Sequence, residues 1–153
     1  GIFTKYLCEN CHEPCSCTYT VGMFCCDAMG SYSLLYPYFA DDAGESDYWN
    51  GVAITNLSDK AGTATLTIYE ADGDVGTAKI DVPAYGVKAY LLSGIPGATI
   101  TKKGTAAGAG TLFDTRCYIQ VDTDFSADGF AMISDNANNG ASMGYLPRQA
   151  EGN

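Results

Sequence analysis

Histidine, positive charge and long apolar runs are what this chain has least of. Its 153 residues include a single histidine, His12. A Ser-His-Asp or Cys-His-Asp triad needs a histidine as general base, and His12 lies inside a cysteine motif, so no such triad is credible. No glycine-rich phosphate loop stands between a strand and a helix either. We therefore predict that the chain is not an enzyme.

Basic residues are few, with 8 Lys and Arg against 18 Asp and Glu and a formal net charge of −10 at pH 7. Nucleic acid and anionic lipid surfaces would repel such a chain, so we expect neither as a partner. No apolar run approaches the ~20 residues of a membrane span. No basic and then apolar leader follows Gly1. If the chain is exported, as we expect, its signal peptide has already been removed.

The sequence also has no convincing amphipathic helix, and beyond Gly30 it consists of short alternating segments. We predict a cysteine-rich head at 1–29, irregular in structure, and a β-sandwich domain at 30–153. Without helical crossovers, an antiparallel all-β sandwich is favoured over an α/β sheet. About eight strands are expected: Ser33–Phe39, Val52–Asn56, Ala64–Tyr69, Ala78–Val82, Val87–Leu92, Cys117–Asp122, Gly129–Ser134 and Ser142–Leu146.

The clearest expected element is a hairpin whose turn, Asp72-Gly73, tolerates positive φ. Period-two alternation predicts its inward side chains to be Leu66, Ile68, Ala78, Ile80 and Val82. Asp72-Gly73-Asp74 and Asp122-Thr123-Asp124 look like fragments of calcium loops, but neither continues to the ligands of an EF-hand, so we favour turn chemistry. The segment Lys103–Gly110 is too rich in Gly and Ala to pack, and we expect a long mobile loop.

Three stretches of the strand region carry a diffuse resemblance. They are Tyr48–Leu57 (YWNGVAITNL), Tyr69–Gly73 (YEADG) and Asp128–Met132 (DGFAM). Together they resemble a group of uncharacterised bacterial secreted β-sandwich domains, over Ser31–Arg148. The resemblance implies the fold and export, and it implies no activity. The cysteine-rich head lies outside it.

Cysteine, in contrast, is abundant, with 7 in the chain and six of them in the first 26 positions. Cys8-Glu9-Asn10-Cys11-His12 fits C-x-x-C-H, the attachment sequence of c-type haem. Two thiols at this spacing add to the haem vinyl groups, and the next residue offers an imidazole to the iron. The sole histidine directly follows the sole C-x-x-C. We therefore predict haem c at Cys8, Cys11 and His12.

The sixth iron ligand stays open, because a single histidine excludes two imidazoles from one chain. Met23 and Met29 are candidates, beside a cysteine, the Gly1 amine, a group from a neighbouring subunit, or no ligand at all. Two alternatives to haem remain for the head. One is a metal or iron–sulfur centre, and the other is disulfides alone, with His12 an exposed polar residue.

The other cysteines are disulfide candidates: Cys15, Cys17, Cys25, Cys26 and Cys117. Cys117 begins a strand in which it alternates with Ile119 and Val121, so its side chain should face the core. A bridge to it from Cys25 or Cys26 would tie the head to the sandwich and contribute about 2–4 kcal/mol. Setting two cysteines aside for haem leaves an odd number, which hints at a bond between chains.

Aromatic residues gather before the core strands: Tyr32, Tyr36, Tyr38, Tyr48 and Trp49. We expect them to pack with their hydroxyls reaching the surface, the alternative being a subunit or ligand contact.

These observations predict an extracellular or cell-surface, c-type cytochrome-like protein that transfers electrons to a redox partner. One haem per chain carries electrons far only where chains stack, so we expect self-association into a homopolymer such as a surface filament. The alternative is a cofactor-free structural subunit or adhesin of a filament, stapled by disulfides. A small-molecule binding module is a weaker third hypothesis.

Overall fold

The computed structural model of the chain describes residues 32–40, 48–135 and 141–149. These residues form ten strands and one short 3-10 helix, η1 (Leu92–Gly94). The strands are β1 (Tyr32–Phe39), β2 (Tyr48–Asn56), β3 (Gly62–Glu70), β4 (Val75–Val82), β5 (Val87–Leu91), β6 (Thr99–Lys102), β7 (Cys117–Thr123), β8 (Ala127–Asp135), β9 (Ala141–Tyr145) and β10 (Arg148–Gln149).

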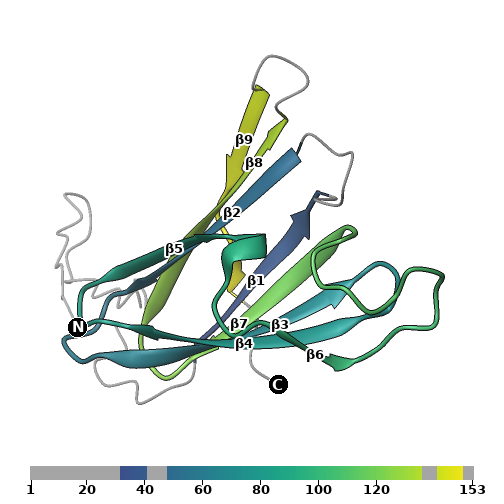
Figure 1. Cartoon of the computed structure of the whole chain (residues 1–153). Helices are drawn as coiled ribbons and strands as arrows, with labels where there is room; N and C mark the ends of the chain where they lie inside the picture. The colour runs from purple at the N-terminus through teal and green to yellow at the C-terminus, as the bar shows by residue number, and fades with distance from the viewer. Residues whose placement is uncertain (1–31, 41–47, 136–140, 150–153) are drawn as a thin grey trace, which may run out of the picture.

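The strands form two antiparallel sheets (Figure 1). The larger has the order β10-β1-β7-β3-β4-β6, and the smaller has the order β5-β2-β8-β9. The predicted antiparallel all-β sandwich is therefore confirmed. Two strands, β6 and β10, were not indicated by the sequence, because four and two residues are too short for an alternation to stand out.

Alternation of side chains fixes which residues face the core. Along β3 and β4 every second residue is buried. The inward residues predicted for this hairpin are all 3% exposed or less: Leu66, Ile68, Ala78, Ile80 and Val82. The smaller sheet adds Val52, Ile54, Ala131 and Ile133, each at most 4% exposed. Each large aliphatic side chain buried in this way stabilises the fold by ~1.5–3 kcal/mol.

Three hydrogen bonds tie β1 and the residue that follows it, Ala40, to β2, and so join the two sheets. The Tyr36 hydroxyl on β1 donates to the backbone oxygen of Ala53 on β2 at 2.8 Å. Gly129 on β8 provides the space for the Tyr36 hydroxyl, because a Cβ at position 129 would lie 1.9 Å from that hydroxyl oxygen. The side-chain amide of Asn50 on β2 accepts from the backbone N–H of Ala40 at 3.0 Å and donates to the backbone oxygen of Ala40 at 3.1 Å. For Tyr36, 0% exposed, the expectation that its hydroxyl reaches the surface is wrong.

The expected head at 1–29 lies outside the described residues, so the division near residue 30 stays a prediction. Within the described ranges, no helix has the length and apolar character needed to cross a membrane.

Candidate functional site

Most of the residues that the sequence singled out lie outside the described ranges. They are Cys8, Cys11 and His12 of the haem motif, the methionines Met23 and Met29, and the disulfide candidates Cys15, Cys17, Cys25 and Cys26. Their roles stay predictions.

Cys117 is the one predicted site residue within the described structure. It begins β7, pairs in register with Glu70 of β3, and is 5% exposed. Ile119 and Val121 follow on the same face, each 0% exposed, so the predicted inward orientation is confirmed. Its role as a disulfide partner for the head stays a prediction.

An acidic cluster forms at the turn between β3 and β4. The Gly73 N–H donates to the backbone carbonyl oxygen of Glu70 at 3.1 Å, and the Glu70 N–H donates to the backbone carbonyl oxygen of Asp74 at 3.0 Å. Gly73 has a φ of +94°, a conformation that favours glycine, so the predicted turn is confirmed. The Asp72 carboxylate accepts from the Asp74 N–H at 3.0 Å, which is the turn chemistry expected of Asp.

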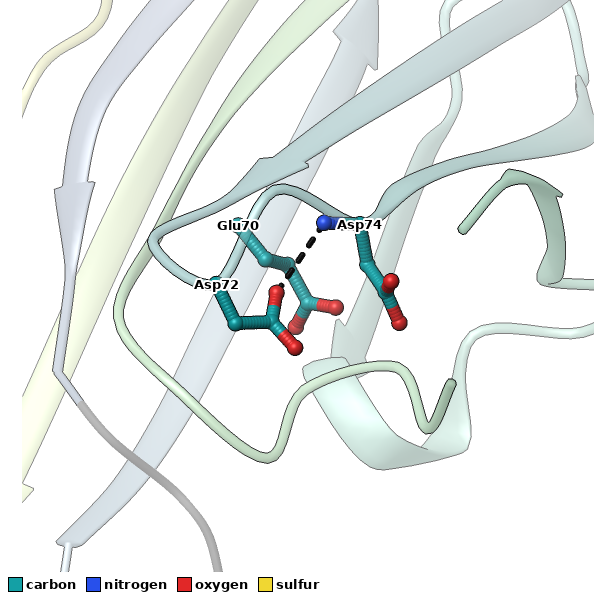
Figure 2. Close-up of side chains that lie close together, drawn as sticks. All are labelled: Glu70, Asp72 and Asp74. Atoms are coloured by element: carbon teal, nitrogen blue, oxygen red, sulfur yellow. Dashed lines mark hydrogen bonds between the residues drawn. The ribbon is translucent and has the colours of Figure 1, made fainter. Parts of the chain in front are cut away.

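The carboxylates of Glu70, Asp72 and Asp74 converge on one small space (Figure 2). One oxygen from each lies within 4.8 Å of the others. Asp74 is 0% exposed and Glu70 is 7% exposed, whereas Asp72 is half-buried. The turn thus gathers three acidic groups in a place that water reaches poorly.

The cluster also holds the segment that follows β6. Asp74 accepts the Gly104 N–H through Oδ1 and the Gly110 N–H through Oδ2, each at 2.5 Å. Oε1 of Glu70 accepts the Phe113 N–H, also at 2.5 Å. No residue of the Gly- and Ala-rich loop 103–110 is buried, as expected of a segment that does not pack, but Asp74 fixes the backbone N–H groups of Gly104 and Gly110 near its two ends.

Glu70 is the least compensated member of the cluster. Its pKa is raised from 4.5 to about 7, chiefly by burial and also by the charges of Asp114, Asp72 and Asp74, against the lowering effect of the Phe113 N–H. Its second oxygen, Oε2, is buried and has no hydrogen-bond partner among the described residues. Leaving such an atom unpaired costs ~1–3 kcal/mol, and more for a charged group.

Glu70 was not predicted as a site residue, because it follows the expected strand Ala64–Tyr69 and stood out only within the Tyr69–Gly73 stretch of the resemblance. The available signal was the spacing Glu-x-Asp-x-Asp from Glu70 to Asp74, which places alternate carboxylates on one side of a tight turn. These donors are all oxygen atoms, which suit hard cations such as Ca²⁺ rather than thiolate- or imidazole-binding metals.

A second feature is the outer surface of the smaller sheet, which faces away from the core. Gly51 on β2 pairs with Leu91 on β5 and with Met132 on β8. The next outward position is Ala53, flanked in the same way by Ala89 and Phe130. We call this surface the outer apolar face, made of Trp49, Gly51, Ala53, Val87, Ala89, Leu91, Phe130 and Met132.

The outer apolar face is exposed and hollowed. Val87 is 60% exposed and Leu91 52%, while Phe130 and Met132 are 39% and 37% exposed. A shallow groove of about 330 Å³ runs between Trp49, Leu91 and the β8 side chains, over the small residues of β2 and β5. Contiguous apolar surface of this kind marks interaction sites in soluble proteins.

Comparison with known proteins supports the fold alone. No family model matches the chain, and no curated protein matches its sequence. A solved structure with a similar fold is the crystal structure of Thermotoga maritima 1070. It has a TM-score of 0.60 and 12% sequence identity, and the match covers 81% of this chain and 98% of that one.

Proposed function

We propose that this chain is a self-associating subunit of an extracellular or cell-surface assembly, in which a second copy of the chain covers the outer apolar face. The observation that carries the proposal is the composition of that face. Its members are all uncharged, and four large ones are more than a third exposed. Burying them would stabilise the assembly by ~25 cal/mol for each Å² of apolar area removed from water.

Charge limits where a second copy of the chain can bind. With a net charge of −10, two copies repel each other over most of their surfaces. The outer apolar face is where two copies can meet without burying an unpaired charge, which would be costly. Self-association should therefore strengthen with salt, because salt screens the remaining repulsion.

The shape of the face also suits contact with a copy of itself. Small residues, Gly51, Ala53 and Ala89, form the floor of the groove, and larger side chains stand around it. A twofold contact can set the large side chains of one copy over the small residues of the other. Such a contact closes a dimer, so the homopolymer needs a second contact, for which we propose the cysteine-rich head.

Analytical ultracentrifugation over a range of protein concentrations tests this function, with the variant Leu91→Lys/Met132→Lys. The wild type should associate reversibly, and the variant should stay monomeric while keeping its far-ultraviolet circular dichroism spectrum. Leu57→Lys is the matched control, because Leu57 is as exposed as Leu91, at 52%, and lies outside the face. A wild type that stays monomeric at high salt contradicts the proposal, as does a control that dissociates as fully as the variant.

A second candidate function, electron transfer, is favoured by one observation in the sequence, the sole histidine directly after Cys8 and Cys11. Haem c needs two thiols that add to its vinyl groups and an imidazole that binds its iron, and the sandwich would then be the scaffold of the assembly. The test is the visible spectrum of protein from its native source, oxidised and reduced. A Soret band that survives denaturation and acid extraction supports haem, and a flat spectrum leaves the disulfide-stapled structural subunit.

A further inference from the structure

The acidic cluster at the β3–β4 turn concentrates negative charge in a small space. Glu70, Asp72 and Asp74 place one oxygen each within 4.8 Å of the others, and two of the three side chains are at most 7% exposed. Like charges this close repel strongly once water is excluded. Hydrogen bonds from three backbone N–H groups offset part of this, on both Asp74 oxygens and on Oε1 of Glu70.

One atom of the cluster lacks a compensating polar contact among the described residues. Oε2 of Glu70 is buried, belongs to a side chain only 7% exposed, and has no hydrogen-bond partner among the described residues. Figure 2 shows the Glu70 carboxylate between those of Asp72 and Asp74. Protonation would answer this oxygen only through a proton shared with a neighbouring carboxylate, which leaves the other negative charges of the cluster in place. A bound cation would satisfy it directly.

We infer that Glu70, Asp72 and Asp74 bind a divalent cation of the calcium class. All three offer hard oxygen ligands, the type that Ca²⁺ and Mg²⁺ prefer. Calcium is favoured over magnesium because the cluster is largely closed to water, and Mg²⁺ gives up its hydration shell reluctantly. The inference is independent of the proposed self-association, because the turn and the outer apolar face belong to different sheets.

Binding would act on the loop between β6 and β7. Its backbone is already held by the cluster, through Asp74 to Gly104 and Gly110 and through Glu70 to Phe113. A cation that neutralises the carboxylates removes their mutual repulsion and so stabilises the conformation that brings them together. A ligand that binds only the folded chain raises its stability in proportion to RT ln(1 + [L]/Kd). The cluster is therefore a calcium-dependent clasp between the hairpin and this loop.

The test is titration of CaCl₂ into the full chain after treatment with a chelator, followed by calorimetry and by the thermal unfolding midpoint. We expect saturable binding with a Kd at or below about 1 mM, the range of extracellular calcium modules. The unfolding midpoint should rise with CaCl₂, and MgCl₂ at equal concentration should raise it less. No saturable binding up to about 10 mM CaCl₂ overturns the inference.

Three substitutions locate the site. Glu70→Gln should weaken binding at least about 10-fold, because it removes one ligand charge and keeps the acceptor for the Phe113 N–H. Asp72→Asn should weaken binding while preserving the fold, since Asn can also accept from the Asp74 N–H. Asp81→Asn is the matched control, an exposed position on β4 whose loss of charge should leave binding unchanged. Equal weakening by the control and by Asp72→Asn overturns the inference.

Glu70→Gln also separates a cation ligand from a purely structural residue. Without calcium, this variant should unfold at the same temperature as the wild type or higher, because it removes a poorly compensated buried charge. With calcium, it should lose most of the rise shown by the wild type. A lower midpoint without calcium, together with an undiminished calcium response, would contradict the assignment of Glu70 as a ligand. If Glu70→Gln does not fold, the comparison of Asp72→Asn with Asp81→Asn decides.

Discussion

Replacing Gly129 with Ala should destabilise the sandwich where its sheets share a hydrogen bond. The new Cβ would lie 1.9 Å from the Tyr36 hydroxyl oxygen and 2.6 Å from the Ala53 backbone oxygen. Neither neighbour can move easily, since Tyr36 is 0% exposed and Ala53 lies within the β2–β8 ladder. Overpacking costs about 1–3 kcal/mol. Displacing the buried hydroxyl from its acceptor costs about 1–3 kcal/mol more.

The free energy of unfolding should therefore fall by about 2–6 kcal/mol, as the sum of these two costs. For a domain of this size the unfolding midpoint should drop by about 4 °C or more. Urea denaturation, followed by circular dichroism and by the fluorescence of Trp49, measures the difference. Gly51→Ala is the matched control on the neighbouring strand, because its Cβ would meet nothing closer than 3.6 Å, and we expect a change of no more than about 1 kcal/mol.

A double-mutant cycle with Tyr36→Phe tests the cause. Removing the hydroxyl removes the nearest clash, so Gly129→Ala should cost less in the Tyr36→Phe background than in the wild type, with a coupling of at least about 1 kcal/mol. The reasoning fails if the two substitutions are additive, or if Gly129→Ala is as mild as Gly51→Ala.

Three other predictions follow from buried polar groups. Burial raises the pKa of Tyr145 to about 12 and raises that of Tyr36 further. The free energy of unfolding should therefore keep the contribution of these neutral hydroxyls below pH 10 and lose it as the pH rises toward 12. Absorbance at 295 nm should then show these tyrosines ionising only as the chain unfolds, and a free titration near pH 10 by all the tyrosines would contradict their burial. Asn50→Ala should cost about 1–3 kcal/mol in urea denaturation, since it leaves the N–H and oxygen of Ala40 without their partner. Asp74→Asn leaves one side-chain oxygen to accept from the Gly104 and Gly110 N–H groups where the carboxylate has two. Limited proteolysis should therefore cut the β6–β7 loop faster than in the wild type. An unchanged rate would show that the Asp74 carboxylate does not hold this loop.

The faces of the central hairpin could be predicted from the sequence because polar and apolar residues alternate there without interruption. In β3, threonines separate Ala64, Leu66 and Ile68, and in β4 charged residues separate Ala78, Ile80 and Val82. A strand turns successive side chains to opposite faces, so the pattern alone identifies the buried side. Gly73 likewise indicated the turn, since few other residues adopt its positive φ.

The outer apolar face was not predictable in this way. In β2 and β8 apolar residues occupy both faces, as Val52 beside Ala53 and Phe130 beside Ala131 illustrate. The alternation then carries no contrast, and only the packing of one sheet on the other decides which side stays in contact with solvent.

The acidic cluster depended most on tertiary structure. The sequence placed Glu70, Asp72 and Asp74 two residues apart, but their burial comes from a loop that follows three strands later, after β6, and folds back over the turn. The N–H groups of Gly104 and Gly110 reach Asp74 across 30 and 36 residues of chain. The local pattern thus determined the strands, the turn and the spacing of the carboxylates. Only long-range packing decided that water would be excluded from them, which is the condition that makes a lone buried oxygen a site for a cation.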